Sequence, residues 1–187
     1  MKLIILDRDG VINYDSDQFI KSLDEWKPLP GSLEAIARLA QAGYRVVVAT
    51  NQSGVGRGLF DMPALNAIHN KMHKAVAQAG GRIDAVFFCP HAAEASCDCR
   101  KPKGGMLEEI AARYNANLKG VPAVGDSLRD LDVAVNAGAQ PILVLTGKGK
   151  YGLCAQGQGR FAARHADLSK SGGSSGYPSL IWYSYAR

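Results

Sequence analysis

Apolar and polar positions fall into two alternating patterns over the first 147 residues of the chain. Between short runs of apolar residues lie longer segments in which apolar residues recur every three or four positions, as Leu65, Ile68, Met72 and Val76 do. The short, nearly continuous runs predict buried strands at 2–6, 44–50, 84–88, 121–126 and 141–147. The longer segments predict helices within 31–43, 62–81, 104–116 and 127–139.

This alternation predicts the fold class. Right-handed crossovers place helices on both faces of a parallel sheet, so we expect an α/β protein with a three-layer, Rossmann-like arrangement and a mainly parallel sheet. The gaps between successive strands are too short to hold a large cap domain. Ligands of such sheets bind beyond the carboxyl ends of the strands, and polar residues follow several strands of this chain.

Length and charge narrow the class of protein. At 187 residues the chain suits one domain, and its net charge of +5 comes from 22 basic and 17 acidic residues without a long basic block. This charge permits an anionic ligand and does not require nucleic acid. No apolar run approaches the roughly 20 residues that span a bilayer, and the first strand does not resemble a secretory signal. We expect a cytoplasmic monomer that binds neither nucleic acid nor a membrane.

Two aspartates, Asp7 and Asp9, follow the first strand, although like charges repel each other and are costly to bury. A carboxylate at a strand end can attack phosphorus and form an aspartyl-phosphate. A second carboxylate two residues later points the same way in extended backbone, so it can protonate the leaving oxygen and then activate water. Two anions that face a phosphate need a cation, and Mg²⁺ with Asp126 as a further ligand meets that need.

Four motifs, "DRDGVIN", "ATNQSG", "CRKP" and "GDSLRD", resemble in order and spacing those of the haloacid dehalogenase (HAD) superfamily of phosphatases. The resemblance covers residues 3–147. It implies that Asp7 is the nucleophile and Asp9 the general acid and base. It also implies that Thr50 donates its hydroxyl to the transferring phosphoryl group and that Lys101 stabilises the charge there. Mg²⁺ would be held by Asp7, Asp126 and the backbone carbonyl of Asp9.

The segment "CPHAAEASCDC" gathers four candidate metal ligands: Cys89, His91, Cys97 and Cys99. Three thiolates and one imidazole suit a closed tetrahedral zinc site of the structural kind, and the alternative is a loop of reduced thiols. Iron takes similar ligands, but four-coordinate structural sites of this composition usually hold zinc. Arg100 and Lys101 follow directly, so zinc would pin both.

Within the superfamily this segment resembles the branch of D-glycero-D-manno-heptose 1,7-bisphosphate 7-phosphatases and histidinol-phosphate phosphatases, and "NQSGVGRG" and "CRKPKGGM" favour the former. The implied reaction is Mg²⁺-dependent hydrolysis of the 7-phosphate, which leaves heptose 1-phosphate for surface glycan or lipopolysaccharide core synthesis. Arg100 would help to recognise substrate, since arginine binds phosphate oxygens in a bidentate way. Further substrate contacts are implied at Asp15, Ser16, Asp17, Gln18, Asn51, Gln52 and Ser53.

Three other functions stay open: histidinol-phosphate phosphatase, polynucleotide 3'-phosphatase, and a zinc-stabilised binding module that has lost catalysis. No groove of interleaved basic and aromatic residues supports the polynucleotide substrate. A decayed site would be expected to lack at least one of Asp7, Asp9, Lys101 and Asp126, and all four are present.

Four residues near the motifs are left out of the predicted site. His69 and His73 lie four positions apart on a predicted helix, where an exposed face explains them better than metal binding does. Arg57 is explained equally well by solvent and by phosphate. Asp130 could orient Lys101 or support the ligands of the metal, and the simpler explanation is that an acidic residue is favoured in the first turn of a helix.

The end of the chain departs from the family pattern, which usually continues after "TGKG" with a strand and a helix. Residues 151–187 hold a Gly/Ser-rich run and clustered aromatics, without sustained helical or strand periodicity. We hypothesise that the reading frame changes near residue 150, which would make this tail non-native or disordered. The predicted organisation is a phosphatase domain at 1–150, with the zinc loop at 89–99, followed by an atypical tail.

Overall fold

A computed structural model describes residues 1–149, 161–165 and 181–185. Its centre is a parallel sheet of five strands in the order β3-β2-β1-β4-β5. The strands are β1 (Lys2–Leu6), β2 (Tyr44–Asn51), β3 (Ala85–Cys89), β4 (Pro122–Gly125) and β5 (Gln140–Leu143). Because all five run in the same direction, their carboxyl ends meet at one edge of the sheet, and β1 ends in the middle of that edge.

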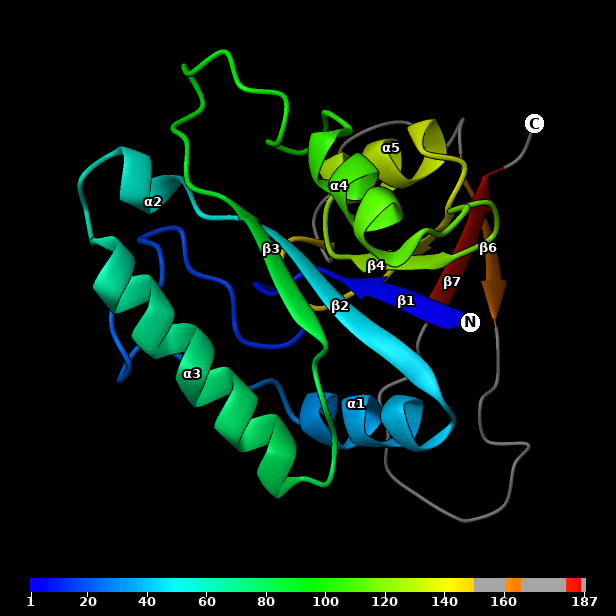
Figure 1. Cartoon of the computed structure of the whole chain (residues 1–187), viewed down its shortest axis with the longest axis horizontal. Coiled ribbons are helices and arrows are strands. Elements are labelled where there is room, and N and C mark those ends of the chain that lie inside the picture. Colours follow the sequence, from blue (N-terminus) through cyan, green and yellow to red (C-terminus); the bar gives the residue numbers. More distant parts are fainter. Residues whose placement is uncertain (150–160, 166–180, 186–187) are drawn as a thin grey trace.

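Helices cover both faces of the sheet, which gives three layers (Figure 1). α1 (Ser32–Gln41) and α3 (Met62–Gln78) lie on one face, and α4 (Gly105–Tyr114) and α5 (Leu128–Asn136) lie on the other. A single helical turn, α2 (Ser53–Gly56), follows β2 directly. α3 begins where the side chain of Asp61 accepts a hydrogen bond from the backbone N–H of Ala64 at 2.9 Å.

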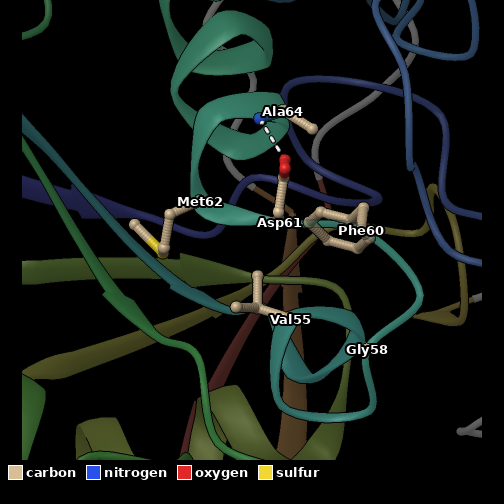
Figure 2. A pocket seen from close by; sticks show the side chains of 6 residues that line it. All are labelled: Val55, Gly58, Phe60, Asp61, Met62 and Ala64. Atoms are coloured by element: carbon tan, nitrogen blue, oxygen red, sulfur yellow. Dashed lines mark hydrogen bonds between the residues drawn. The ribbon is translucent and has the colours of Figure 1, made fainter.

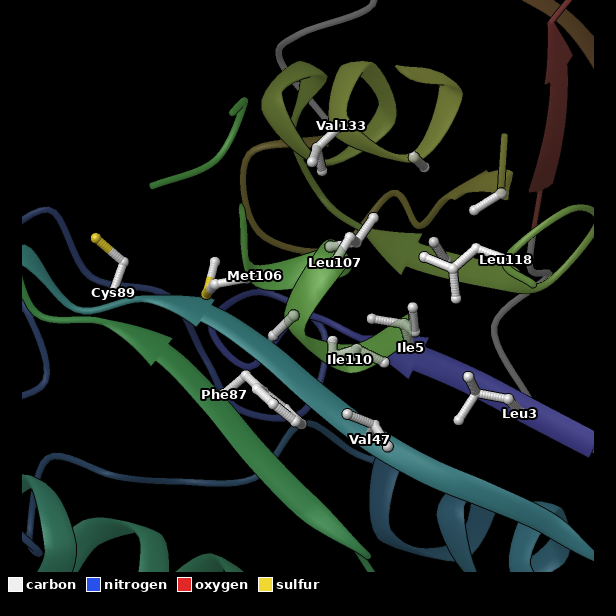
Figure 3. Packing of buried hydrophobic residues seen from close by; sticks show 14 residues of the cluster. Leu3, Ile5, Val47, Phe87, Cys89, Met106, Leu107, Ile110, Leu118 and Val133 are labelled. Atoms are coloured by element: carbon white, nitrogen blue, oxygen red, sulfur yellow. The ribbon is translucent and has the colours of Figure 1, made fainter. Parts of the chain in front are cut away.

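Two apolar clusters hold these layers together, and the alternation of side chains along each strand divides residues between them. Leu3 and Ile5 of β1 point to the α4 and α5 face, where they join a cluster that includes Leu107, Ile110 and Val133 (Figure 3). On the opposite face β1 and β2 meet α1 and α3 through Ile4, Leu6, Val46, Val48, Ile36, Ile68, Met72 and Val76. The sheet is therefore buried on both sides, as its nearly continuous apolar strands predicted.

The long connection from β1 to α1, residues 7–31, contains no helix or strand, yet its middle is anchored in the core. Trp26 is 1% exposed and donates its indole N–H to Asn13 Oδ1 at 3.0 Å. This hydrogen bond ties the connection back to the segment that carries Asp9.

The expected fold class is confirmed, because all five predicted strands and all four predicted helices are present. The strands begin and end within a residue or two of their expected bounds, except that β5 ends at Leu143 and not at 147. α2 was not predicted, and it forms within the glycine-containing loop "NQSGVGRG". Two further strands, β6 (Phe161–His165) and β7 (Ile181–Tyr185), pair antiparallel in the segment where no strand periodicity was expected. No helix in the described parts of the chain is long and apolar enough to span a membrane.

Candidate active site

Three aspartates, two that follow strands and one at the start of a helix, converge beyond the sheet. Carboxylate oxygens of Asp7, Asp126 and Asp130 all lie within 4.8 Å of one another. Asp7 follows β1 and its backbone N–H bonds to the carbonyl of Val124 in β4 at 2.8 Å, so the two strand ends are held together. Asp126 is the residue after β4, and Asp130 comes from the first turn of α5.

A buried lysine lies against this cluster. Lys101 Nζ donates to Asp130 Oδ1 at 2.5 Å and to the carbonyl of Ala49 at 2.8 Å, and it forms an ion pair with Asp7 Oδ2 at 3.0 Å. Burial opposes its charge, but Asp130 and Asp7 raise the pKa of Lys101 above its usual value. The lysine therefore stays charged and is fixed beside the predicted nucleophile.

One lysine does not balance three carboxylates. Burial, offset in part by Lys101, raises the pKa of Asp7 to about 8, and the neighbouring aspartates add like-charge repulsion. Burial also raises the pKa of Asp126 to about 6. Asp130 differs, because Lys101 and the Ser127 side chain and backbone N–H lower its pKa despite burial. Asp7 and Asp126 thus offer carboxylate oxygens whose negative charge Lys101 does not fully neutralise, and Mg²⁺ prefers such ligands.

Backbone at two glycines closes around Asp126. Gly10 (φ +78°) and Gly147 (φ +57°) approach so closely that a Cβ on either would lie 2.2 or 2.3 Å from Asp126 Oδ2. The same oxygen accepts the backbone N–H of Lys148 at 2.7 Å. Thr146 donates its hydroxyl to the carbonyl of Gly10 at 2.5 Å, so the loop after β5 is fastened to the loop after β1.

Asp9, the predicted acid and base, faces a different environment. Its carboxylate accepts hydrogen bonds from Arg8 Nε at 3.1 Å and Nη2 at 2.9 Å, from Asn13 Nδ2 at 2.9 Å and from Gln52 Nε2 at 2.9 Å. Burial opposes the charge, yet the Arg8 guanidinium and the two amides lower the pKa of Asp9. The pKa values of Asp7 and Asp9, which lie two residues apart, are therefore shifted in opposite directions.

The residues after β2 connect the parts of the site. Thr50 is 1% exposed, and its hydroxyl oxygen accepts Gln52 Nε2 at 2.9 Å. Asn51 exchanges two hydrogen bonds with the backbone of Lys101, at 3.0 and 3.1 Å. Gln52 and Ser53 are buried. The side chains of Asn51 and Gln52 are thus engaged within the protein, and their substrate contacts stay predictions.

The predicted substrate loop at 15–18 lies across from the loop after β5. Lys148 Nζ pairs with Asp15 at 3.3 Å and with Asp17 at 3.4 Å. Ser16 Oγ accepts the backbone N–H of Gln18 at 3.1 Å, which is local loop geometry. Asp17 and Gln18 are exposed. Among the described residues, these four therefore border the site without a hydrogen bond to Asp7, Lys101 or Asp126.

The four predicted zinc ligands gather in one cluster with all ligand atoms within 4.8 Å of one another: Cys89, His91, Cys97 and Cys99. Cys89 Sγ lies 3.6 Å from Cys97 Sγ and 3.6 Å from His91 Nδ1, which lies 3.3 Å from Cys99 Sγ. Ligands bound to zinc at about 2.0–2.3 Å in a tetrahedron lie about 3.3–3.8 Å apart, so the donor set fits the ion. No disulfide joins the three thiols.

The cysteine loop leads straight into the active site. Arg100, next to Lys101, is partly buried, and its Nη1 atom is a buried donor without a hydrogen-bond partner among the described residues. Gly105, which starts α4, approaches Asp98 so closely that a Cβ would lie 2.7 Å from its carbonyl oxygen. The loop and the start of α4 therefore hold the Arg100 and Lys101 backbone from both sides.

Two cavities border the described surface. One of about 190 Å³ adjoins the aspartate cluster and is lined by Asp126, Ser127, Leu128, Arg129, Leu143, Lys148 and Gly149. An open groove of about 580 Å³ lies between α2 and the start of α3 (Figure 2), lined by Val55, Gly58, Phe60, Asp61, Met62 and Ala64. The first is continuous with the site; the second is lined by none of its predicted residues.

The expectation for His69 was wrong. Its side chain is 7% exposed, not on an exposed helical face, and its Nε2 lies 3.3 Å from Arg8 Nη1. Arg8 is fully buried. The sequence did not single it out, because an arginine between two aspartates is explained by balancing their charge in a loop. His73, four residues on, is partly buried. Asp130 does hold Lys101, one of the two roles considered for it.

Asp7 and Asp9 follow one strand of a parallel α/β sheet, Asp126 follows the neighbouring strand, and a buried lysine lies against Asp7. This arrangement is the one expected of a phosphatase site of the HAD type. A model described as polynucleotide kinase 3 phosphatase matches residues 2–129, and one described as HAD-hydrolase-like matches residues 98–169. Together the two matches cover the residues of this site: the first includes Asp7, Asp9, Lys101 and Asp126, and the second includes Lys101, Asp126 and Asp130.

Relatives narrow the class further. A D-glycero-beta-D-manno-heptose-1,7-bisphosphate 7-phosphatase of Bordetella bronchiseptica is 65% identical over 84% of this chain and 87% of its own length, and one of Neisseria meningitidis is 57% identical over 84% of each. A crystal structure of the B. bronchiseptica D,D-heptose 1.7-bisphosphate phosphatase with magnesium and phosphate shares 64% identity and a TM-score of 0.82, over 84% of this chain and 88% of that one. The chain belongs to this phosphatase family of the HAD superfamily, and it is a phosphoric monoester hydrolase.

Proposed function

We propose that the protein hydrolyses the 7-phosphate of D-glycero-D-manno-heptose 1,7-bisphosphate through an aspartyl-phosphate on Asp7, with Mg²⁺ as cofactor. The observation that carries this proposal is the arrangement of Asp7, Lys101 and Asp126, with Asp9 separately oriented two residues away. Phosphoryl transfer depends mainly on positioning and charge compensation, and these residues supply both.

In the first step a carboxylate oxygen of Asp7 forms a bond to phosphorus as the bond from phosphorus to the sugar oxygen breaks. Lys101 compensates the charge that spreads over the phosphoryl oxygens, and Thr50 donates its hydroxyl to one of them. Asp9 gives a proton to the departing sugar oxygen. Its pKa is low at rest, but an arriving phosphate dianion raises it, because a like charge disfavours the ionised carboxylate.

In the second step Asp9, now a carboxylate, takes a proton from water as the water oxygen attacks the phosphorus of the aspartyl-phosphate. The bond from phosphorus to Asp7 breaks, and inorganic phosphate leaves. Mg²⁺ held by Asp7, Asp126 and the Asp9 carbonyl supplies charge neutralisation for the phosphoryl group and its nucleophile.

The cysteine loop has a supporting role in this proposal. The three thiolates and His91 would hold zinc, and the bound ion would fix the backbone that carries Arg100 and Lys101. In the part of the chain that the structure describes, no group accepts a hydrogen bond from Arg100 Nη1, and an anionic oxygen of the substrate would provide the acceptor. A sugar bisphosphate offers a second phosphate for such a contact. The product, heptose 1-phosphate, would pass to nucleotide activation for a surface glycan or lipopolysaccharide core.

A second candidate, polynucleotide 3'-phosphatase, is favoured by the family model that matches residues 2–129. The chemistry at Asp7 would be unchanged, and the difference would lie in the groove that receives the leaving group. The net charge of +5 is compatible with it. The heptose substrate is preferred because relatives of 55–65% identity carry that name.

The test measures phosphate release with Mg²⁺ from both anomers of heptose 1,7-bisphosphate, histidinol phosphate and a 3'-phosphorylated oligonucleotide. We expect kcat/KM for one heptose anomer to exceed that for the other substrates by about a hundredfold, since most of the discrimination comes from contacts to the leaving group. Asp7→Asn, which removes the nucleophile and little volume, serves as the blank. Faster turnover of histidinol phosphate or the oligonucleotide would reject the heptose proposal in favour of that substrate.

A further inference from the structure

The Arg8 side chain is fully buried beneath Asp9, and all of its nitrogens have acceptors. Nε and Nη2 bond to the Asp9 carboxylate, and Nη2 also bonds to Gln52 Oε1 at 3.1 Å. Nη1, on the far side of the fork, reaches only His69 Nε2, at 3.3 Å, among the described residues. His69 comes from the middle of α3, sixty-one residues after Arg8.

The chemistry of this contact fixes the state of His69. A guanidinium has only donors and keeps its proton in proteins, so the histidine nitrogen that faces it must be the acceptor. Nε2 therefore carries the lone pair, and the single proton of a neutral imidazole sits on Nδ1. Burial and the adjacent Arg8 charge agree, because together they lower the pKa of His69 to about 3. Phe88 lies beside the ring, with centroids 5.8 Å apart.

His69 is the one polar side chain among the buried residues of α3. The other buried residues of α3 are apolar: Leu65, Ile68, Met72 and Val76. A leucine would fill the same position in the core, but it would leave a buried guanidinium N–H without an acceptor, which is costly. The polar residue is thus explained by its contact with Arg8 and not by the packing of α3.

We propose that His69 is a positioning residue for the acid and base step: its neutral imidazole anchors the Arg8 fork, which in turn orients the Asp9 carboxylate toward the sugar oxygen. This inference rests on the proposed function, because it assumes that Asp9 protonates the leaving group. Without the anchor, Arg8 turns toward other acceptors, and Asp9 loses one of the three side chains that orient its carboxylate. Asn13 and Gln52 keep their hydrogen bonds to it.

The distinguishing readout is the dependence on the leaving group. The value of kcat/KM covers steps up to formation of the aspartyl-phosphate, in which the leaving group departs. A sugar alkoxide needs a proton from Asp9, whereas 4-nitrophenolate is a good leaving group without one. A defect in folding or in phosphate binding would lower kcat/KM for both the sugar phosphate and 4-nitrophenyl phosphate. A defect in the orientation of Asp9 lowers kcat/KM for the sugar phosphate only.

The experiment compares wild type with His69→Leu, His69→Gln and His73→Leu, using heptose 1,7-bisphosphate and 4-nitrophenyl phosphate with saturating Mg²⁺. We expect His69→Leu to lower kcat/KM for the sugar phosphate about tenfold to a hundredfold and that for the aryl phosphate less than about threefold. His69→Gln, whose side-chain oxygen accepts from Arg8, should recover most of the loss. His73→Leu, a matched histidine on the same helix, should match wild type.

Equal losses for both substrates in His69→Leu, or no rescue by His69→Gln, would overturn the inference. A wild type that releases phosphate from neither substrate would instead refute the proposed function, so the two failures are distinguishable. If wild type prefers histidinol phosphate, that alkyl phosphate replaces the sugar in the comparison.

A second measurement does not depend on the stability of His69→Leu. In the wild-type protein at neutral pH, nitrogen NMR of the histidine rings should show His69 as the neutral tautomer protonated on Nδ1. A ring protonated on Nε2, or on both nitrogens, would contradict the proposed contact with Arg8.

Discussion

At the residue scale, the pKa values of the two aspartates on either side of Arg8 are shifted in opposite directions. Asp7 is buried among like charges and its pKa is raised, whereas Asp9 is surrounded by donors and its pKa is lowered. The two environments therefore distinguish the predicted nucleophile Asp7, whose negative charge requires a further cation, from Asp9, whose carboxylate already has one in Arg8.

Gly10 illustrates how backbone shape fixes a side chain. We expect Gly10→Ala to abolish most activity, by about a hundredfold, because its Cβ would displace Asp126 and a misplaced catalytic group costs about that factor. The matched control is Gly43→Ala, which has a similar φ of +81° but no atom within 4 Å of the place that its Cβ would occupy. Both variants should lose about 1 kcal/mol of unfolding free energy from left-handed backbone strain.

The measurements are kcat/KM, Mg²⁺ affinity by calorimetry, and urea unfolding. Equal activity of the two alanine variants would show that the close approach at Gly10 does not fix Asp126.

Part of this site was predictable at the residue scale and part was not. Asp7 and Asp126 follow apolar strands, and the rule that ligands bind at strand ends predicted that these two strand ends meet, as the proximity of their carboxylates shows. The contact between His69 and Arg8 joins residues sixty-one positions apart, and pattern alone does not reveal it. One signal was present: His69 lies four residues after Leu65, on the same buried stripe of α3.

At the element scale, the segment between β3 and α4 acts as one support for the site. It begins at Cys89 at the end of β3 and folds back on itself at the thiol and imidazole cluster. It then leads to Lys101, which lies against Asp7. Asn51 at the end of β2 fastens the backbone of Lys101 from the other side. The sequence predicted the cluster from its ligand spacing, but it did not reveal this reciprocal pair of hydrogen bonds.

We expect Cys97→Ser to lower the zinc content well below one ion per chain and to reduce kcat/KM about tenfold or more, because small displacements of a positioned group are costly. Elemental analysis of the purified protein and phosphate release would measure the two effects. Cys154→Ser removes a thiol outside the cluster segment 89–99 and should change neither.

Loss of zinc with full activity would separate the cluster from catalysis. Iron in place of zinc in the wild-type protein would correct the identity of the metal and leave the positioning role of the loop unchanged.

At the scale of the whole molecule, the sheet and its four long helices followed from periodicity because helices cover both faces of the sheet. Leu3 and Ile5 meet one helical layer while Ile4 and Leu6 meet the other, so β1 is apolar from Leu3 to Leu6. α2 escaped prediction because one turn is too short to show a helical period. The assignment of the tail from residue 151 onward falls mostly outside the described residues and stays a prediction.

The proposed change of reading frame near residue 150 has a specific consequence. The last described loop of the domain, up to Gly149, still closes against Asp126, so the site is complete before the tail begins. We therefore expect a chain whose end is restored to the family pattern to keep the kcat/KM of the present chain within about threefold, since no group that touches substrate would change. Resequencing the gene and measuring the intact mass would identify an insertion or deletion near codon 150. An uninterrupted natural gene encoding residues 151–187 would reject the frame change, and a large gain in activity on restoration would show that the tail obstructs the site.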